Sequence, residues 1–187
     1  GGGRGGRCDW GGCGGGLTIV VRVSGGPWVV GGVGDQVRAV IEAWEPGSMG
    51  GRDCAEILFG ETNPSGKLPV TFPRHSGQIP CYYNRKIAHT WLNYAVGRST
   101  PLFDFGYGLS YTSFEISPIQ LSDSEMRPGE RITARVTVKN TGSREGEEVV
   151  QLYLRDLKSS VVRPIKELKD FRPIRLAAGA SYTVVFA

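Results

Sequence analysis

A short stretch in the middle of the chain, from Pro101 to Phe114, separates two regions with different hydrophobic patterns. Its sequence, PLFDFGYGLSYTSF, is too rich in aromatic rings for a flexible linker and too rich in glycine for the interior of a helix. Mixed helix and strand signals precede it, and only strand signals follow it. The sequence therefore predicts an ordered connector, residues 101–114, at a change of fold class.

The region before the connector carries an α/β pattern. The apolar run LTIVVRV, residues 17–23, predicts a strand buried on both faces. Residues 36–44 place apolar side chains at helical spacing after Asp35, which predicts a helix. A second short helix is expected over residues 50–59, ending at Gly60, and a strand over residues 68–72. We expect a partial α/β domain over residues 17–100, in which residues 74–100 form a long loop.

The region after the connector alternates apolar and polar residues with a period of two. Residues 131–139 alternate without a break, and residues 149–155 and 182–186 continue the pattern. Short strands separated by glycine-containing turns predict an all-β sandwich of the immunoglobulin or fibronectin type III kind over residues 115–187. Since a complete sandwich of this class needs roughly 100 residues, we expect this one to be truncated.

The first 16 residues, GGGRGGRCDWGGCGGG, form a glycine-rich terminus that we expect to be disordered. Arg4 and Arg7 between glycines leave an RNA-binding tail as an alternative. The net charge of +4 is mild and too weak to argue for nucleic acid by itself. The chain contains no apolar run long enough to cross a membrane and no signal-peptide pattern at its start. Localisation stays open, and a periplasmic or secreted protein is compatible with the sequence.

The cysteines and histidines show no metal-binding pattern. There is no CxxC pair, and neither histidine stands at ligand spacing from a cysteine. The cysteines are typical of small apolar packing groups. We therefore expect no metal ion and no cofactor. The residues concerned are Cys8, Cys13, Cys54, Cys81, His75 and His89.

The long loop contains four aromatic residues that are candidates for contact with a sugar. Flat rings can stack on the apolar faces of pyranose rings, but they also anchor loops to the body of a domain. The spacing does not distinguish these two roles. The candidates are Tyr82, Tyr83, Trp91 and Tyr94.

Three segments in order resemble glycoside hydrolase family 3, the β-glucosidases and β-xylosidases. They are EAWEPGSMGGRDCAEILFGETNPSGKLPVTFP from Glu42 to Pro73, GQIPCYYNRK from Gly77 to Lys86, and PLFDFGYGLSYTSF itself. The later segment VVQLYLRDLKSSVVRPIKELKDF is similar to the fibronectin type III-like domain of these enzymes. The resemblance extends over about residues 17–187.

The resemblance implies an enzyme larger than this chain. Complete members carry a barrel with an Asp nucleophile, an α/β sandwich domain and often the fibronectin-like domain, and they cleave β-glycosides with retention. Retention needs two carboxyl groups about 5–5.5 Å apart. The barrel and its nucleophile are absent here, and aligning Arg7-Cys8-Asp9 with the family pattern places Gly3 at the position of the acid/base Glu. We therefore expect no catalytic residue in this chain.

Other positions take structural roles under this resemblance. The connector aromatics Phe103, Phe105, Tyr107 and Tyr111 are predicted to pack the junction between the α/β domain and the fibronectin-like domain. Ser48 stands in a motif where the family usually has Glu, and it is predicted to cap the helix that follows. Structural roles are also predicted for the remaining carboxylates considered as catalysts, which are Glu45, Glu56, Glu61 and Asp104.

Two functional hypotheses remain. The first is that the chain is the C-terminal part of a retaining β-glycosidase, inactive without its barrel. In the full-length enzyme its partners would be that barrel and a β-linked oligosaccharide or an aryl or alkyl glycoside; neither nucleic acid nor a membrane is expected as a partner. The alternative is a non-catalytic carbohydrate-binding or docking module.

Overall fold

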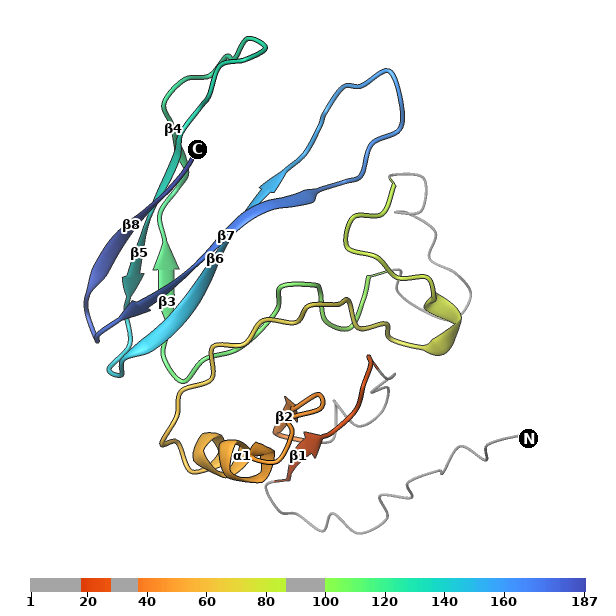
Figure 1. Cartoon of the computed structure of the whole chain (residues 1–187), viewed down its shortest axis with the longest axis vertical. Coiled ribbons are helices and arrows are strands. Elements are labelled where there is room, and N and C mark those ends of the chain that lie inside the picture. Colours follow the sequence, from red (N-terminus) through yellow and green to blue (C-terminus); the bar gives the residue numbers. More distant parts are fainter. Residues whose placement is uncertain (1–17, 28–36, 87–99) are drawn as a thin grey trace.

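The computed structural model describes residues 18–27, 37–86 and 100–187. The described chain is rich in strands, with a small helical region at its N-terminal end and two sheets at its C-terminal end (Figure 1). The predicted disordered terminus, residues 1–16, lies outside the described residues. Within them, no helix is long and apolar enough to cross a membrane.

The first two strands form a small parallel sheet. Strand β1 (Ile19–Arg22) pairs in parallel with β2 (Ala39–Glu42), and Val20 lies opposite Val40. The helix predicted over residues 36–44 is therefore wrong. The β-branched side chains of this segment suit a strand, and pairing with β1 satisfies its backbone groups without a helix.

Strand β1 confirms the strand predicted within residues 17–23 but not its burial on both faces. Its side chains alternate, and Ile19 and Val21 are 47% and 39% exposed. On the opposite face Arg22 forms an ion pair with Glu42, at 3.0 Å, beneath the ring of Phe72. The apolar run therefore has one covered face among the described residues.

Helix α1 (Gly50–Leu58) confirms the second predicted helix. It ends at Leu58, and Gly60, two residues later, has a φ of +76° and donates its N–H to the carbonyl of Ile57, as a C-terminal glycine stop does. The predicted N-cap is wrong, because Met49 occupies that position and no side chain caps the helix.

Two extended segments, residues 61–73 and 100–113, cross the middle of the molecule side by side (Figure 1). The backbone of Leu68 exchanges hydrogen bonds with Gly106 and Tyr107, and Phe72 bonds to Phe103. The strand predicted over residues 68–72 is wrong, since only an isolated bridge forms at Phe72. Pro69 lacks an N–H and cannot donate a ladder hydrogen bond at this position.

The C-terminal part consists of two antiparallel sheets that face each other (Figure 1). In the first sheet, β5 (Ala134–Asn140) pairs on one edge with β3 (Phe114–Ile116) and β4 (Gln120–Leu121), and on the other with β8 (Ser181–Phe186). In the second, β6 (Gly146–Leu154) pairs with β7 (Glu167–Leu176). Three of these strands were predicted from alternation, with boundaries shifted by up to three residues.

The core lies between the two sheets. It consists of side chains that alternate inward from β5, β6, β7 and β8, as the period of two requires. Strand β7 was missed in the sequence because charged residues and Pro173 interrupt its pattern. Pro173 is tolerated because β7 is the outer member of a two-stranded sheet. The buried core residues are Ala134, Val138, Val150, Ile174, Leu176, Val184 and Phe186.

One polar side chain, Asn140 at the end of β5, is fully buried among these residues. Its Oδ1 accepts a hydrogen bond from the hydroxyl of Thr112 at 2.7 Å and one from the N–H of Gly142 at 3.1 Å. Its Nδ2 donates to the carbonyls of Arg144 at 2.7 Å and Leu176 at 3.0 Å. The amide therefore uses all of its donors, which is how a buried polar group becomes stable.

Replacing Asn140 tests this arrangement. Asn140→Ala removes the side chain that bonds the hydroxyl of Thr112 and the carbonyls of Arg144 and Leu176, and we expect the free energy of unfolding to fall by about 3 kcal/mol. Asn84→Ala, which changes an exposed residue, is the matched control and should stay within about 0.5 kcal/mol. Urea unfolding followed by circular dichroism measures both, and equal midpoints for the two variants would contradict the proposed role.

Candidate functional site

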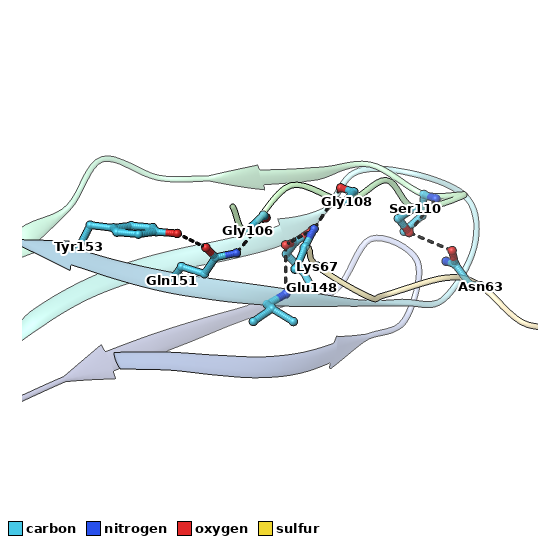
Figure 2. Close-up of polar contacts among 10 residues, drawn as sticks. Asn63, Lys67, Gly106, Gly108, Ser110, Glu148, Gln151 and Tyr153 are labelled. Atoms are coloured by element: carbon cyan, nitrogen blue, oxygen red, sulfur yellow. Dashed lines mark hydrogen bonds and ion pairs between the residues drawn. The ribbon is translucent and has the colours of Figure 1, made fainter. Parts of the chain in front are cut away.

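The most densely connected polar region lies where the extended segments meet the second sheet (Figure 2). We call it the junction network. It links residues from the N-terminal region, the connector and β6, which are far apart in the sequence. Its members are Asn63, Lys67, Gly106, Gly108, Ser110, Glu148, Gln151 and Tyr153.

An ion pair lies near the centre of the junction network. The Nζ atom of Lys67 lies 2.8 Å from Oε1 of Glu148, and both side chains are only 16% exposed. The same ammonium donates to the carbonyl of Gly108 at 3.2 Å. Because both charges are largely removed from water, loss of either partner leaves the other poorly compensated.

Two glycines allow the connector to approach its neighbours closely. Gly106 has a φ of +80°, and a Cβ there would overlap Oε1 of Gln151, whose Nε2 donates to the Gly106 carbonyl at 3.1 Å. Gly108 has no such positive φ, but a Cβ there would overlap the carbonyl oxygen of Gly66. The hydroxyl of Tyr153 in turn donates to Oε1 of Gln151. The packing therefore requires glycine at both positions.

Asn63 joins the connector to the beginning of β6. Its Oδ1 accepts hydrogen bonds from the hydroxyl of Ser110 at 2.9 Å and from the N–H of Tyr111 at 2.8 Å. Its Nδ2 donates to the carbonyl of Glu145 at 3.0 Å. One side chain thus fixes three separate segments.

The four connector aromatics contact one another and the N-terminal region, and Arg144 lies over the ring of Tyr111. Phe103 stacks on Tyr107 at 5.2 Å between ring centroids, and Phe105 stacks on Tyr83 at 4.2 Å. The hydroxyl of Tyr111 donates to the carbonyl of Ile57 at the end of α1, at 2.7 Å. Their packing between the two domains stays a prediction.

Of the candidate sugar-contacting residues, Tyr82 and Tyr83 both line one small hollow. Tyr83 lies between Phe105 and Tyr153, and its hydroxyl accepts a hydrogen bond from the N–H of Leu168 at 3.3 Å. Tyr82 exposes its ring to solvent. Trp91 and Tyr94 lie outside the described residues. Tyr83 thus makes packing contacts that suit an anchor, and the sugar-contacting role of Tyr82 and Tyr83 stays a prediction.

Of the carboxylates considered as catalysts, Glu56 has a clear structural partner. It accepts hydrogen bonds from Arg52 at 2.8 Å and from Thr62 at 3.2 Å. These bonds, that of Arg52 first, lower the pKa of Glu56. A general acid near neutral pH needs a raised pKa, so this arrangement opposes acid catalysis at Glu56.

Two hollows lie beside the junction network. The larger, about 410 Å³, has a polar lining that includes Glu61, Arg144 and Arg175. The smaller, about 70 Å³, is lined by Cys81, Tyr82 and others; burial raises the pKa of the Cys81 thiol. Within the described ranges, no group of three or more His, Cys, Asp or Glu side chains could hold a metal ion.

Comparison with known proteins identifies the family. The model of the glycosyl hydrolase family 3 C-terminal domain matches residues 14–111, and that of a fibronectin type III-like domain matches residues 148–187. The chain belongs to glycosyl hydrolase family 3. The predicted membership is therefore confirmed.

Named relatives of this family 3 chain are glycosidases. It is 42% identical to a periplasmic β-glucosidase of Salmonella typhimurium, over 90% of this chain and 23% of the relative. It is 38% identical to a β-xylosidase of Formosa agariphila, over 90% of this chain and 24% of the relative. The chain also superimposes, with a TM-score of 0.86, on the crystal structure of a Listeria innocua β-glucosidase in complex with isofagomine. The two are 37% identical, and the match covers 92% of this chain and 26% of the Listeria innocua chain. The family 3 chain thus spans about a quarter of these relatives.

Sequence reasoning found the aromatic residues of the junction but missed its polar ones. Lys67, Glu148 and Gln151 are ordinary surface residue types, and nothing in their spacing signals that they meet. The one available signal was the presence of charged and amide side chains within the otherwise apolar strand β6. Such side chains must either face solvent or have a polar partner.

The ion pair of the junction network makes a stability prediction. Lys67→Met and Glu148→Gln each remove one charge from a largely buried pair, and we expect each to lower the free energy of unfolding by about 1–3 kcal/mol. The exposed pair of Arg52 with Glu56 is the control, because such pairs contribute only about 0.3–0.5 kcal/mol. A double-mutant cycle for each pair measures the coupling, and similar values for the two pairs would rule out a special role for Lys67.

The close approach at Gly108 makes a second prediction. Gly108→Ala places a methyl group against the carbonyl of Gly66, so the two extended segments must separate, and we expect destabilisation of about 1–3 kcal/mol. Gly66→Ala is the matched control, because a Cβ at residue 66 meets no atom within 4 Å. Thermal unfolding of both variants measures the difference, and equal stability would show that the segments do not pack closely here.

Proposed function

We propose that this chain serves as the C-terminal part of a retaining β-glycosidase, a β-glucosidase or β-xylosidase, that hydrolyses O-glycosyl bonds in carbohydrate metabolism. The observation that carries the proposal is the family 3 membership, together with relatives of both specificities that match over 90% of the chain. The partners of the complete enzyme are then its barrel domain and a β-linked oligosaccharide or an aryl or alkyl glycoside.

Under this proposal the described residues support the catalytic machinery and do not contribute acid or base. Retaining hydrolysis needs a nucleophile and an acid/base carboxyl group. Glu42, Glu56 and Glu148 are occupied in ion pairs with Arg22, Arg52 and Lys67. The proposal accordingly includes that this chain alone has no glycosidase activity.

The proposal includes a domain organisation, which the contacts of the connector support. Residues 17–100 form part of the α/β domain, residues 101–114 form the connector and residues 115–187 form the fibronectin-like domain. The junction network and the connector aromatics hold the last of these against the first. The glycosidase role is favoured over the alternative of a carbohydrate-binding module, since Tyr83 is occupied by packing.

A chimeric enzyme tests the proposed function. In it, residues 18–187 replace the matching stretch of the Salmonella typhimurium β-glucosidase, which is 42% identical. We expect the chimera to hydrolyse aryl β-glucosides or aryl β-xylosides, and the 187-residue chain alone to hydrolyse neither.

Two controls define the outcome. The unmodified Salmonella enzyme gives the reference rate, and the same enzyme without the matching stretch gives the background. A chimera that unfolds cooperatively but has only background activity would contradict the proposal. Turnover by the isolated chain would also contradict it, because a catalytic pair would then lie within these residues.

A further inference from the structure

The connection between β6 and β7, residues 155–166, is a long loop that projects away from both sheets (Figure 1). Connections within β-hairpins usually have about two to five residues, and longer ones without secondary structure are often functional. This loop contributes nothing to the buried core. Its length therefore needs another explanation.

The base of the loop is fixed to the N-terminal region. The N–H of Ile165 donates to the carbonyl of Arg85 at 3.0 Å, and Pro164 forms an isolated bridge with Lys86. The ammonium of Lys166 lies 5.0 Å from the centre of the Tyr153 ring. Residues 164–166 are thus held at several points. They fix the direction in which the tip of the loop, residues 157–162, projects.

The tip exposes apolar side chains that the described chain does not cover. Leu157, Val161 and Val162 are 80%, 64% and 61% exposed. A group of exposed aliphatic residues on one projecting element is typical of an interaction site. Burial of all three would remove a substantial apolar area from water.

The charge of the loop indicates which kind of surface can bind it. Basic residues outnumber the single acidic residue, Asp156; they are Arg155, Lys158, Arg163 and Lys166. Two loops of this charge would repel each other, which disfavours a tip-to-tip contact between copies of the chain. Arg163 is paired with Glu167, so Arg155 and Lys158 are the basic groups for which a complementary surface needs an acidic rim around an apolar centre.

We infer that the tip of this loop docks on the part of the glycosidase that lies outside this chain. This inference rests on the proposed function. Relatives that match over 90% of this chain extend to about four times its length, so in such an enzyme most of the surface available for docking belongs to that part. The contact adds a second point of attachment, remote from the junction network, that holds the fibronectin-like domain against the catalytic region.

The test compares the isolated chain with the chimera that contains residues 18–187. The triple variant Leu157→Ser/Val161→Ser/Val162→Ser should leave the Tm of the isolated chain unchanged, because these side chains are exposed there. In the chimera it should lower the Tm by about 3 °C or more, because a buried contact is lost. Met126→Ser is the matched control, since Met126 is 59% exposed on a different loop of the same sandwich, and it should change neither Tm.

Hydrogen exchange gives a second measurement that needs no variant. Amides of residues 155–163 should exchange at least about tenfold more slowly in the chimera than in the isolated chain. Equal exchange rates, or an equal fall in Tm in both proteins, would overturn the inference. It would also be overturned by sedimentation showing a dimer of the isolated chain that the triple variant dissolves, because the occupant would then be a second copy.

The outcomes for this inference and for the proposed function are separable. A chimera that protects the loop but has no activity contradicts the glycosidase proposal alone. An active chimera with an unprotected loop contradicts the docking inference alone.

Discussion

The satisfied amide of Asn140 is the interaction on which the arrangement of the C-terminal part depends. Its side chain holds Thr112 from the connector, Arg144 before β6 and Leu176 at the end of β7. Its backbone also bonds to Ala180 before β8. A buried amide is stable only when its donors and acceptors are paired. If one of these segments moved away, the amide would lose a hydrogen bond, so the segments stabilise one another through Asn140. One residue thereby sets the relative position of both sheets and of the incoming chain.

Close packing around Thr112 connects the core to the junction network. Thr112 contacts Gly142 and Gly146, and a Cβ at either glycine would overlap its side chain. A Cβ at Gly146 would also lie 2.7 Å from Nδ2 of Asn63, the residue that holds the connector. The end of the connector, the start of β6 and the segment around Asn63 thus lie at their closest packing distance. A flexible tether would need none of these contacts, so the connector is an ordered joint.

Local pattern was sufficient to predict the elements whose side-chain period is clean. Alternation predicted β5, β6 and β8, and Gly60 predicted the stop that follows α1. It failed for residues 36–44, because Val40 and Ile41 fit both a helical face and a strand, and the pairing with β1 decides between them. The polar junction was not predictable, since Lys67 and Glu148 meet only after the whole chain has folded. Family resemblance supplied the proposed function, which no residue pattern within these segments specifies.

The polar contacts of the junction network explain how the orientation of the N-terminal region relative to the C-terminal sheets is fixed. Apolar contact alone tolerates sliding, because it has no directional preference. The bond from Gln151 to the Gly106 carbonyl and the contacts of Lys67 with Glu148 and Gly108 are directional, and they lie along one line of the connector. Stacking of Phe105 on Tyr83 then positions the chain that carries Arg85, to which the base of the 155–166 loop is bonded. The direction in which that loop projects is therefore a consequence of the same contacts that join the two parts of the chain.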